Sequence, residues 1–445
     1  MKSIKSYILL LLLSVFSLNS CSDYFGDINL DPDNPLSVTP DVLLSQIEAR
    51  IAYVVGGDAS RYIGIYTQHV DGCCRQFFVY QNYGVQGVDV DVLWGQNLYS
   101  SILMDNRQLL TQAEANGYNH YAGVSKAIEA YAMMLLTDLF GDAPYSDAFQ
   151  GTDLLQPQFD TQEEIYTAIF RLITESRALL AMEDAGVLFP GPDDLIYGGD
   201  LAKWGKFLNT IEARGRLHLS NVNADNYQAA LDALDRGAFE GEQDDAIFGF
   251  ALAATSSAPW FQYTQQRDDI DVGANYVALM EGLNDPRGAV YGAPIDQGVP
   301  HPILVADRQF PLLTYTEQEF IRAEATLETR GATAAHPIYL NAIRSSFNDA
   351  GLSESAYNDY IAQAAVDPGA ASLTMEEVMT QKYIALFLDP EVFTDWRRTG
   401  IPDLTPNSGS QIPRRLPYAQ NEVLSNTNTP SPTMVTQFTP VWWDQ

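Results

Sequence analysis

Aromatic and planar polar side chains gather in two stretches of the sequence, and together they could bind a sugar. Rings stack against the C–H faces of sugars while planar polar groups hydrogen-bond the hydroxyls, so a shallow sugar site needs rings on loops. The denser stretch contains Arg75, Phe77, Phe78, Tyr80 and Tyr83, followed by Trp94 and Asn97 at the entry of a predicted helix. The second contains Trp260, Phe261, Tyr263 and Arg267. We predict ligand contact at these two stretches.

Each of these rings also has an ordinary structural role open to it. Trp94 and Tyr99 are spaced as core residues of an amphipathic helix usually are. The rings between residues 77 and 83 could equally cover an edge of the core or contact a partner protein. The same alternatives hold for Trp260 and Tyr263.

The sequence offers no recognisable catalytic set. Its five histidines form no His-Glu-x-x-His helix, and Gly-x-Ser-x-Gly is absent. Carboxylates are too numerous for the sequence to nominate an acid–base pair, so a surface glycoside hydrolase stays open as an alternative. His69 precedes the Cys73-Cys74 pair, but without a second spaced ligand pair a structural histidine is favoured over a zinc ligand. We predict a protein that is not an enzyme and that has no cofactor or metal site.

Several charged residues are expected to be structural. The Asn284-Asp-Pro-Arg287 turn and the Asp395-Trp-Arg397 segment are each predicted to hold an internal salt bridge. Lys203, Trp204 and Arg214 lie on a helix whose apolar stripe faces inward, which favours buried pairing over catalysis.

Helical periodicity covers most of the chain and predicts an all-α fold. Neighbouring helices joined by short breaks are expected to pair into tetratricopeptide-like hairpins. A loop lined with rings is expected over 71–91, an irregular, loop-rich ligand-binding lobe of turns and short strands over 238–308, and an irregular tail after 389. The predicted helices span residues 42–55, 61–70, 92–115, 118–140, 162–182, 200–219, 226–235, 316–328, 335–350, 353–365 and 374–388.

The N-terminus has the pattern of a secretory signal peptide. Lys2 and Lys5 precede an apolar run that is too short to span a membrane. Leu18-Asn19-Ser20-Cys21 resembles a bacterial lipobox, which implies removal of residues 1–20 and acylation of Cys21. The alternative is a secreted protein whose Cys21 merely lies near the cleavage site. Residues 21–40 are expected to form a tether, and residues 41–445 the helical domain.

Composition limits the partners and the cysteine chemistry. A formal net charge of −32 repels phosphate backbones, so nucleic acid is excluded as a partner. Apart from Cys21, the only cysteines are the adjacent Cys73 and Cys74. They could close a vicinal disulfide that stiffens a loop, or they could be two reduced, half-buried thiols.

Several segments, in this order, resemble the SusD/RagB family of outer-membrane nutrient-binding lipoproteins, within it the shorter SusD-like branch. The resemblance covers most of the chain, although Cys73-Cys74 is not attributable to it. The segments that carry it are Cys21–Pro35, Trp94-x4-Tyr99 to Asn106, LTDLFGDAPYSDA after Ala130, Leu201-Ala-Lys-Trp204 to Arg214, Asn284–Arg287, Glu376–Lys382 and Phe393–Arg397.

The resemblance implies a partner and a place in the cell. It implies a lipid-anchored protein on the outer membrane, exposed to the cell exterior, that captures an oligosaccharide. It would deliver this ligand to a SusC-like TonB-dependent outer-membrane barrel. Because family ligands differ, a peptide-capturing, RagB-like protein is the alternative, and a structural scaffold lipoprotein is a less favoured one.

Overall fold

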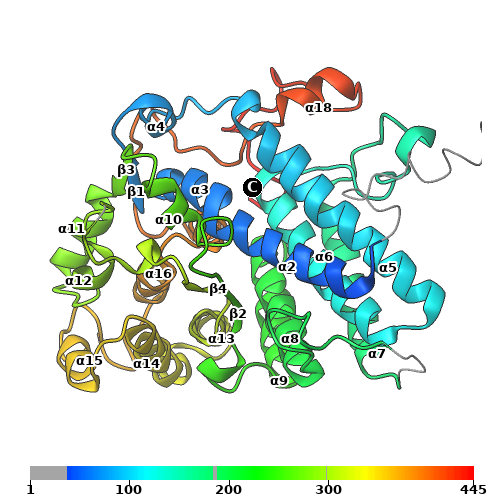
Figure 1. Ribbon diagram of the computed structural model, residues 1–445. Coiled ribbons are helices and arrows are strands. Elements are labelled where there is room, and N and C mark those ends of the chain that lie inside the picture. Colours follow the sequence, from blue (N-terminus) through cyan, green and yellow to red (C-terminus); the bar gives the residue numbers. More distant parts are fainter. Residues whose placement is uncertain (1–37, 184–187, 297, 445) are drawn as a thin grey trace, which may run out of the picture. The chain divides into compact units, whose positions relative to one another are not determined.

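The computed structural model describes residues 38–183, 188–296 and 298–444. The predicted signal peptide, Cys21 and nearly all of the predicted tether lie outside these residues. Pro40–Gln445 form one compact unit. Its described residues are mostly helical with few, short strands, which confirms the predicted all-α class (Figure 1).

The first helix does not stop at its glycine pair, contrary to the prediction. Helix α2 (Pro40–Val54) continues through a π-helical turn, η1 (Val55–Ala59), into α3 (Ser60–Tyr66). A Cβ atom on Gly56 would lie 2.7 Å from the ring of Phe310. Close packing against this ring, and not helix termination, therefore explains the glycine.

The next segment departs from the prediction in two ways. The helix expected over 61–70 ends early, and the chain forms strand β1 (Val70–Gly72). The stretch expected to be a loop contains helix α4 (Arg75–Gln81) and the 3₁₀ turn η2 (Gly87–Val90). Gly-rich flanks hid this short helix, because seven residues give too few turns to establish a period.

The long helical hairpins are confirmed. Helix α6 packs against α5 and α7, and α8 packs against α9. Thr161 and Glu164 form the predicted capping box before α7. The elements of this part are η3 (Val92–Met104), α5 (Asp105–Asn116), α6 (Asn119–Phe140), η4 (Gly151–Asp153), α7 (Gln162–Leu180), α8 (Leu201–His218) and α9 (Asp225–Asp235).

The segment expected to be irregular consists of short elements. Two antiparallel pairs, β1 with β3 and β2 with β4, are the only sheets among the described residues. Three short helices were not predicted there. Its elements are η5 (Glu242–Asp244), β2 (Ala246–Gly249), α10 (Pro259–Thr264), β3 (Ile270–Val272), α11 (Ala274–Gly282), α12 (Gly288–Tyr291) and η6 (Pro302–Leu304), and strand β4 (Gln309–Leu313) follows directly after it.

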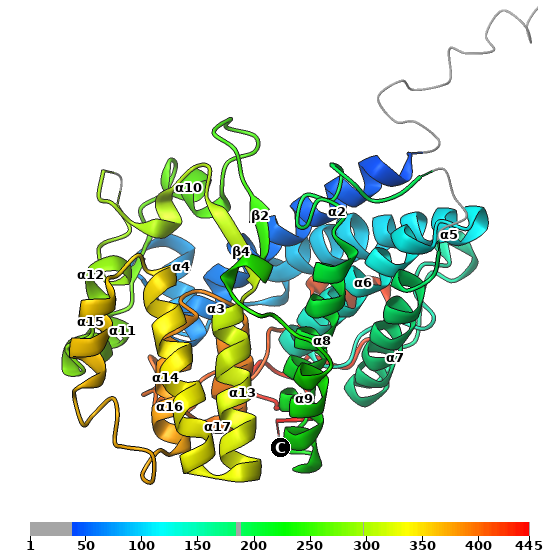
Figure 2. The same cartoon turned by 90° about the horizontal axis from the view of Figure 1, so that it is seen from below.

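The C-terminal part contains the predicted helices and two others in the tail. Figure 2 shows α14, α13, α8 and α7 side by side, and consecutive members of this row are in contact. The prediction of an irregular tail was wrong for α17, which follows directly after Pro390. The elements are α13 (Tyr315–Arg330), α14 (Ala332–Asp349), α15 (Glu354–Ile361), α16 (Met375–Ala385), α17 (Glu391–Thr399) and α18 (Gln420–Ser425).

The helical faces bury an apolar core. One cluster joins α13, α14, α15 and α16 through rings such as Phe320, Tyr339, Phe347 and Tyr360. Across residues 38–183, 188–296 and 298–444, no helix combines the length and apolarity that a bilayer crossing requires.

Candidate functional site

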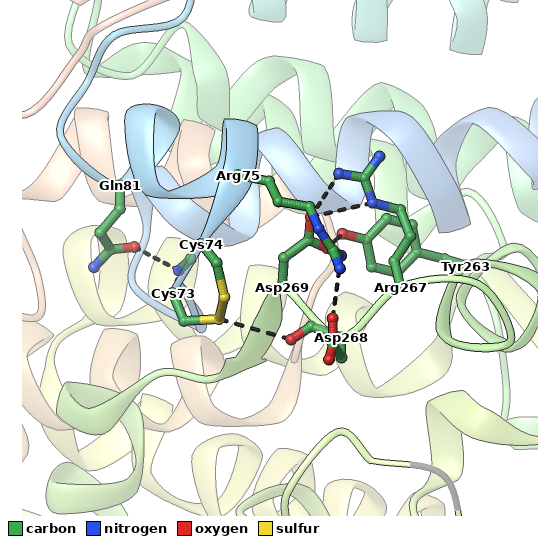
Figure 3. Close-up of a disulfide and its surroundings, with 9 residues drawn as sticks. Cys73, Cys74, Arg75, Gln81, Tyr263, Arg267, Asp268 and Asp269 are labelled. Atoms are coloured by element: carbon green, nitrogen blue, oxygen red, sulfur yellow. Dashed lines mark hydrogen bonds and ion pairs between the residues drawn. A yellow bond between two sulfur atoms is a disulfide. The ribbon is translucent and has the colours of Figure 1, made fainter.

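Strand pairing brings the two aromatic stretches of the sequence together. Strands β1 and β3 are antiparallel, with Val70 opposite Val272 and Gly72 opposite Ile270. Helix α4 follows β1, and α10 precedes β3, so residues 70–81 and 260–272 meet. We call this region the β1–β3 corner (Figure 3).

A charged network links the two sides of the β1–β3 corner. Arg75 Nη1 lies 3.1 Å from Asp268 Oδ1, and both side chains are largely exposed. Arg267 contacts Asp269 at 2.5 Å and donates a hydrogen bond to Gln76 Oε1 at 2.6 Å. Arg75 and Arg267 were predicted site residues, and the structure places both here.

Asp269 is the internal anchor of this network. Its side chain is fully buried, and it accepts hydrogen bonds from Tyr263 and Arg267. Burial alone would raise the pKa of this carboxyl, but the bonds from Arg267 and Tyr263 outweigh burial and lower the pKa. Asp269 therefore stays ionised and holds Arg267, whereas Asp268 remains open to solvent.

Helix α4 turns its rings in opposite directions. Phe77 and Tyr80 are buried, and the Phe77 ring meets Tyr80 and Tyr263 edge to face. Phe78, on the other face, is 58% exposed. Of the predicted rings in α4, Phe78 is thus the one that offers a free face to a ligand.

Two more predicted rings are buried, and one is partly buried. Trp260 donates a hydrogen bond from Nε1 to Ser60 Oγ at 3.0 Å, and Tyr83 accepts one at 2.8 Å from the backbone N–H of Asn407. Tyr263 is half-buried beside Arg267. Trp260 and Tyr83 each connect segments that are distant in the sequence, and Tyr263 packs against Phe77 inside the corner.

Trp94 and Asn97 lie on η3, and their contacts are with residues outside segments 70–81 and 260–272. Asn97 donates a hydrogen bond to Asp58 Oδ2 at 3.1 Å. Trp94 is 3% exposed and packs among rings that include Tyr99 and Phe140. Its edge borders a separate cleft of about 610 Å³ between η3, the loops at 144–157 and α18. The core-packing alternative therefore describes most of the Trp94 ring.

Cys73 and Cys74 form a disulfide, and both residues are exposed. The alternative of reduced, half-buried thiols does not describe this structure. Cys73 donates its backbone N–H to the Asp269 carbonyl at 3.1 Å, and its sulfur lies 3.6 Å from the Asp268 carbonyl oxygen. The disulfide therefore lies between the start of α4 and the segment that leads into β3 (Figure 3).

His69 has a structural position. Its ring contacts Tyr276 and Tyr383, and Nδ1 accepts a hydrogen bond from the Leu388 backbone N–H at 2.9 Å. Burial lowers its pKa to about 3. No group of three or more His, Cys, Asp or Glu side chains within the described residues is arranged to hold a metal ion.

The expected structural ion pairs are partly confirmed. Asp285 pairs with Arg287 at 2.6 Å, and both side chains are fully buried. Asp395 instead pairs with Lys382 and Arg398, which corrects the predicted Asp395–Arg397 bridge. The reason is the direction in which side chains on a helix point. Residues two apart on a helix, such as Asp395 and Arg397, point to different sides, whereas Arg398 lies one turn on.

Of the three α8 residues expected to be buried, two are buried and one is not. Arg214 forms a buried pair with Glu317 at 2.5 Å, and Trp204 is buried, as expected. Lys203 is only half-buried and donates to the Gln243 carbonyl at 2.5 Å, so the expected buried pairing does not include it.

Sequence reasoning missed the polar residues that complete the corner. Gln76 and Asp268 both contact predicted arginines. Asp268 directly follows Arg267, which could have drawn attention to it, but only the pairing of β1 with β3 brings it to Arg75. Gln76 carried no signal of its own in the sequence.

Comparison with known proteins gives one consistent family. A family model described as SusD-like, starch-binding and associating with the outer membrane, matches residues 32–303 and 296–419. No curated protein sequence matches the chain significantly.

Solved structures show the same fold. A SusD homolog from Bacteroides fragilis is 25% identical, with a TM-score of 0.73 over 92% of this chain and 100% of its own. A structure named as a chitin-binding protein is 21% identical, with a TM-score of 0.75 over 92% of this chain and 100% of its own. A SusD-like protein from Bacteroidetes is 21% identical, with a TM-score of 0.77 and the same two coverages.

Proposed function

Because the chain belongs to the SusD-like family of starch-binding proteins that associate with the outer membrane, we propose that it captures an oligosaccharide at the β1–β3 corner. It then delivers this ligand to a SusC-like TonB-dependent barrel. The observation that carries the choice of site is that an exposed ring, Phe78, and the exposed Arg75–Asp268 pair both belong to this corner.

The chemistry of this surface suits a sugar. The free face of Phe78 can stack on the C–H face of a pyranose ring. Arg75 supplies planar N–H donors, and the Asp268 carboxylate supplies acceptors, so both can replace water on sugar hydroxyls. Arg75 also has a positive φ of 53°, a costly backbone conformation for a residue other than glycine, and such positions cluster at functional sites.

The site acts by binding and not by catalysis. Asp269 is committed to Arg267 and Tyr263, and Asp268 is exposed and paired with Arg75. Neither carboxyl is placed in an apolar pocket that would keep it protonated as a general acid. A surface glycoside hydrolase is therefore disfavoured at this corner.

The mature protein is held on the membrane by acyl chains on Cys21 and faces the cell exterior. Several acyl chains on one residue anchor a protein stably, whereas a single chain does so only marginally. This arrangement keeps the protein in the same membrane as the barrel.

Binding to an array of oligosaccharides, including maltoheptaose and chitohexaose, tests the ligand class. The wild-type chain should bind at least one oligosaccharide, and Arg75→Ala should weaken that binding roughly 10- to 100-fold, since a hydrogen bond to a charged group contributes about 1.5–3 kcal/mol. Arg171→Ala is the matched control, because Arg171 is a comparably exposed arginine on α7. Its affinity should equal that of the wild type.

A peptide ligand is the second candidate. The same Arg75–Asp268 pair could contact the charged termini of a peptide, as expected for a RagB-like protein. If a peptide library bound while every oligosaccharide failed, the glycan proposal would be wrong, and peptide capture would replace it.

A further inference from the structure

The disulfide and Phe78 form one apolar surface on the β1–β3 corner. The backbone N–H of Phe78 donates to the carbonyl of Cys74 at 3.1 Å, so the two residues lie one helical turn apart. Cys74 is the N-cap of α4, so Cys73 occupies the position before the cap and Phe78 is the fourth residue of the helix, the two positions whose apolar side chains pack together in a hydrophobic staple. Cys73, Cys74 and Phe78 are all exposed, and we call them the disulfide face.

Hydrogen bonds and close packing fix the backbone that carries the disulfide face. Gly72 donates its backbone N–H to Gln81 Oε1 at 2.9 Å, and Cys73 donates to the Asp269 carbonyl at 3.1 Å. A Cβ atom on Gly72 would lie 2.2 Å from the Phe77 carbonyl oxygen, so only glycine allows this approach of β1 to α4. The position of the sulfurs is thus fixed before any ligand arrives.

Oxidation to the disulfide suits these two residues to contact with an apolar surface. A disulfide has no S–H donor and does not ionise, whereas a free thiol has an S–H donor and can ionise. Its sulfurs are polarisable, and contacts between sulfur and ring or C–H surfaces are favourable. Two adjacent serines would present hydroxyls here instead.

Polar groups border the disulfide face on one side. The Arg75 side chain is 54% exposed and the Asp268 side chain 83% exposed. The sulfur of Cys73 lies close to the backbone of Asp268, so the apolar and polar parts adjoin directly. Apolar area beside planar hydrogen-bonding groups is the arrangement that one pyranose ring requires.

We propose that the Cys73–Cys74 disulfide is itself a ligand-contacting element of the site. Its sulfurs and the Phe78 ring take the C–H face of one sugar unit, while Arg75 and Asp268 hydrogen-bond the hydroxyls of that unit. The inference rests on the proposed oligosaccharide capture and assigns the disulfide a role in affinity, where the sequence alone indicated at most a stiffened loop.

The test measures affinity with and without the disulfide in the full mature chain. The probe is the oligosaccharide of the array that the wild type binds most tightly, with maltoheptaose and chitohexaose among those tried. The double variant Cys73→Ser with Cys74→Ser should bind it about five- to tenfold more weakly, from the loss of sulfur contacts. Phosphine reduction of the wild type should weaken binding to the same extent and leave the double variant unchanged.

Phe78→Ala tests the same surface without touching the cysteines. It should weaken binding about tenfold, from the loss of the stacking ring. Phe189→Ala is the matched control, because Phe189 is 50% exposed and lies outside the corner. Circular dichroism shows whether each variant is folded, and mass spectrometry after alkylation counts the free thiols.

The outcomes separate the two proposals. If the wild type binds an oligosaccharide and neither the double variant nor reduction changes the affinity, the role of the disulfide is overturned while the capture function stands. If free thiols are found at both cysteines of the untreated protein, the inference is also overturned. If the wild type binds no oligosaccharide, both proposals fall together.

Discussion

One buried histidine, His218, connects several helices of this protein. His218 on α8 lies 3.1 Å from Asp138 on α6 and 2.7 Å from Glu391 on α17, and Tyr166 on α7 contacts the same imidazole. The successive helices α6, α7 and α8 and the distant α17 therefore meet at one histidine. A buried histidine between two carboxylates is stable when it carries a charge.

This arrangement predicts a pH dependence of stability. Burial would lower the pKa of His218, but Glu391 and Asp138 outweigh it and raise the pKa to about 9. A folded-state pKa above the unfolded value of about 6.5 means stabilisation that is complete below about pH 6.5. It is lost as pH rises through about 9. The contribution is on the order of 3 kcal/mol.

Urea unfolding between pH 6 and pH 10 measures this effect. The difference in unfolding free energy between the wild type and His218→Asn should be large at pH 6 and small at pH 10. A difference that does not change with pH would mean that His218 is not charged in the folded protein.

At the scale of elements, the long helices follow from the sequence, and the short ones do not. Helices α6 and α7 have several turns each, so their periodicity and the Thr161 cap are visible in the sequence. Helix α4 has seven residues between glycines, and its rings were therefore assigned to a loop. Helical spacing separates Phe78 from Phe77 and Tyr80, and no loop assignment could have predicted that division.

The candidate site was only partly predictable from the sequence. Residue type drew attention to Arg75, Phe78 and Arg267, which do lie at one corner. Their meeting depends on the pairing of β1 with β3, two strands of three residues each that are separated by almost 200 positions. Strands this short leave no usable alternation of apolar and polar residues in the sequence.

A pair of glycine substitutions tests the packing of the first helix. Gly56→Ala places a Cβ 2.7 Å from the buried Phe310 ring, so it should destabilise the protein by about 1–3 kcal/mol. Gly205→Ala, inside α8, meets nothing within 4 Å and should stabilise by about 0.5–1 kcal/mol. Chemical denaturation of both variants measures the two signs. If Gly56→Ala were neutral, the glycine would not be explained by close packing.

At the scale of the whole molecule, the end of the chain returns to the N-terminal helices. Tyr66 on α3 donates a hydrogen bond to Gln437, and the side chain of Gln437 donates to the Tyr83 carbonyl. Trp443 is fully buried, and its Nε1 donates to Asp138 Oδ1 at 3.0 Å. The irregular tail is thus part of the core, although its sequence has no helical period that would have indicated this.

Trp443 and its neighbour provide a matched test of that role. Trp443→Ala removes a buried ring and one of the hydrogen-bond donors to Asp138, and should cost about 3–5 kcal/mol of unfolding free energy. Trp442→Ala changes a half-buried ring next to it and should cost clearly less. Equal effects in thermal or urea unfolding would show that the tail is not anchored through Trp443.

The proposed delivery to a transporter depends on a partner barrel, and co-purification tests it most directly. The native, lipidated protein is isolated from detergent-solubilised outer membrane, and mass spectrometry identifies the proteins that accompany it. The account predicts a TonB-dependent barrel in stoichiometric amount and acyl groups on Cys21. A protein recovered alone, or with a hydrolase in place of a barrel, would contradict delivery to a transporter and favour the scaffold or enzyme alternatives.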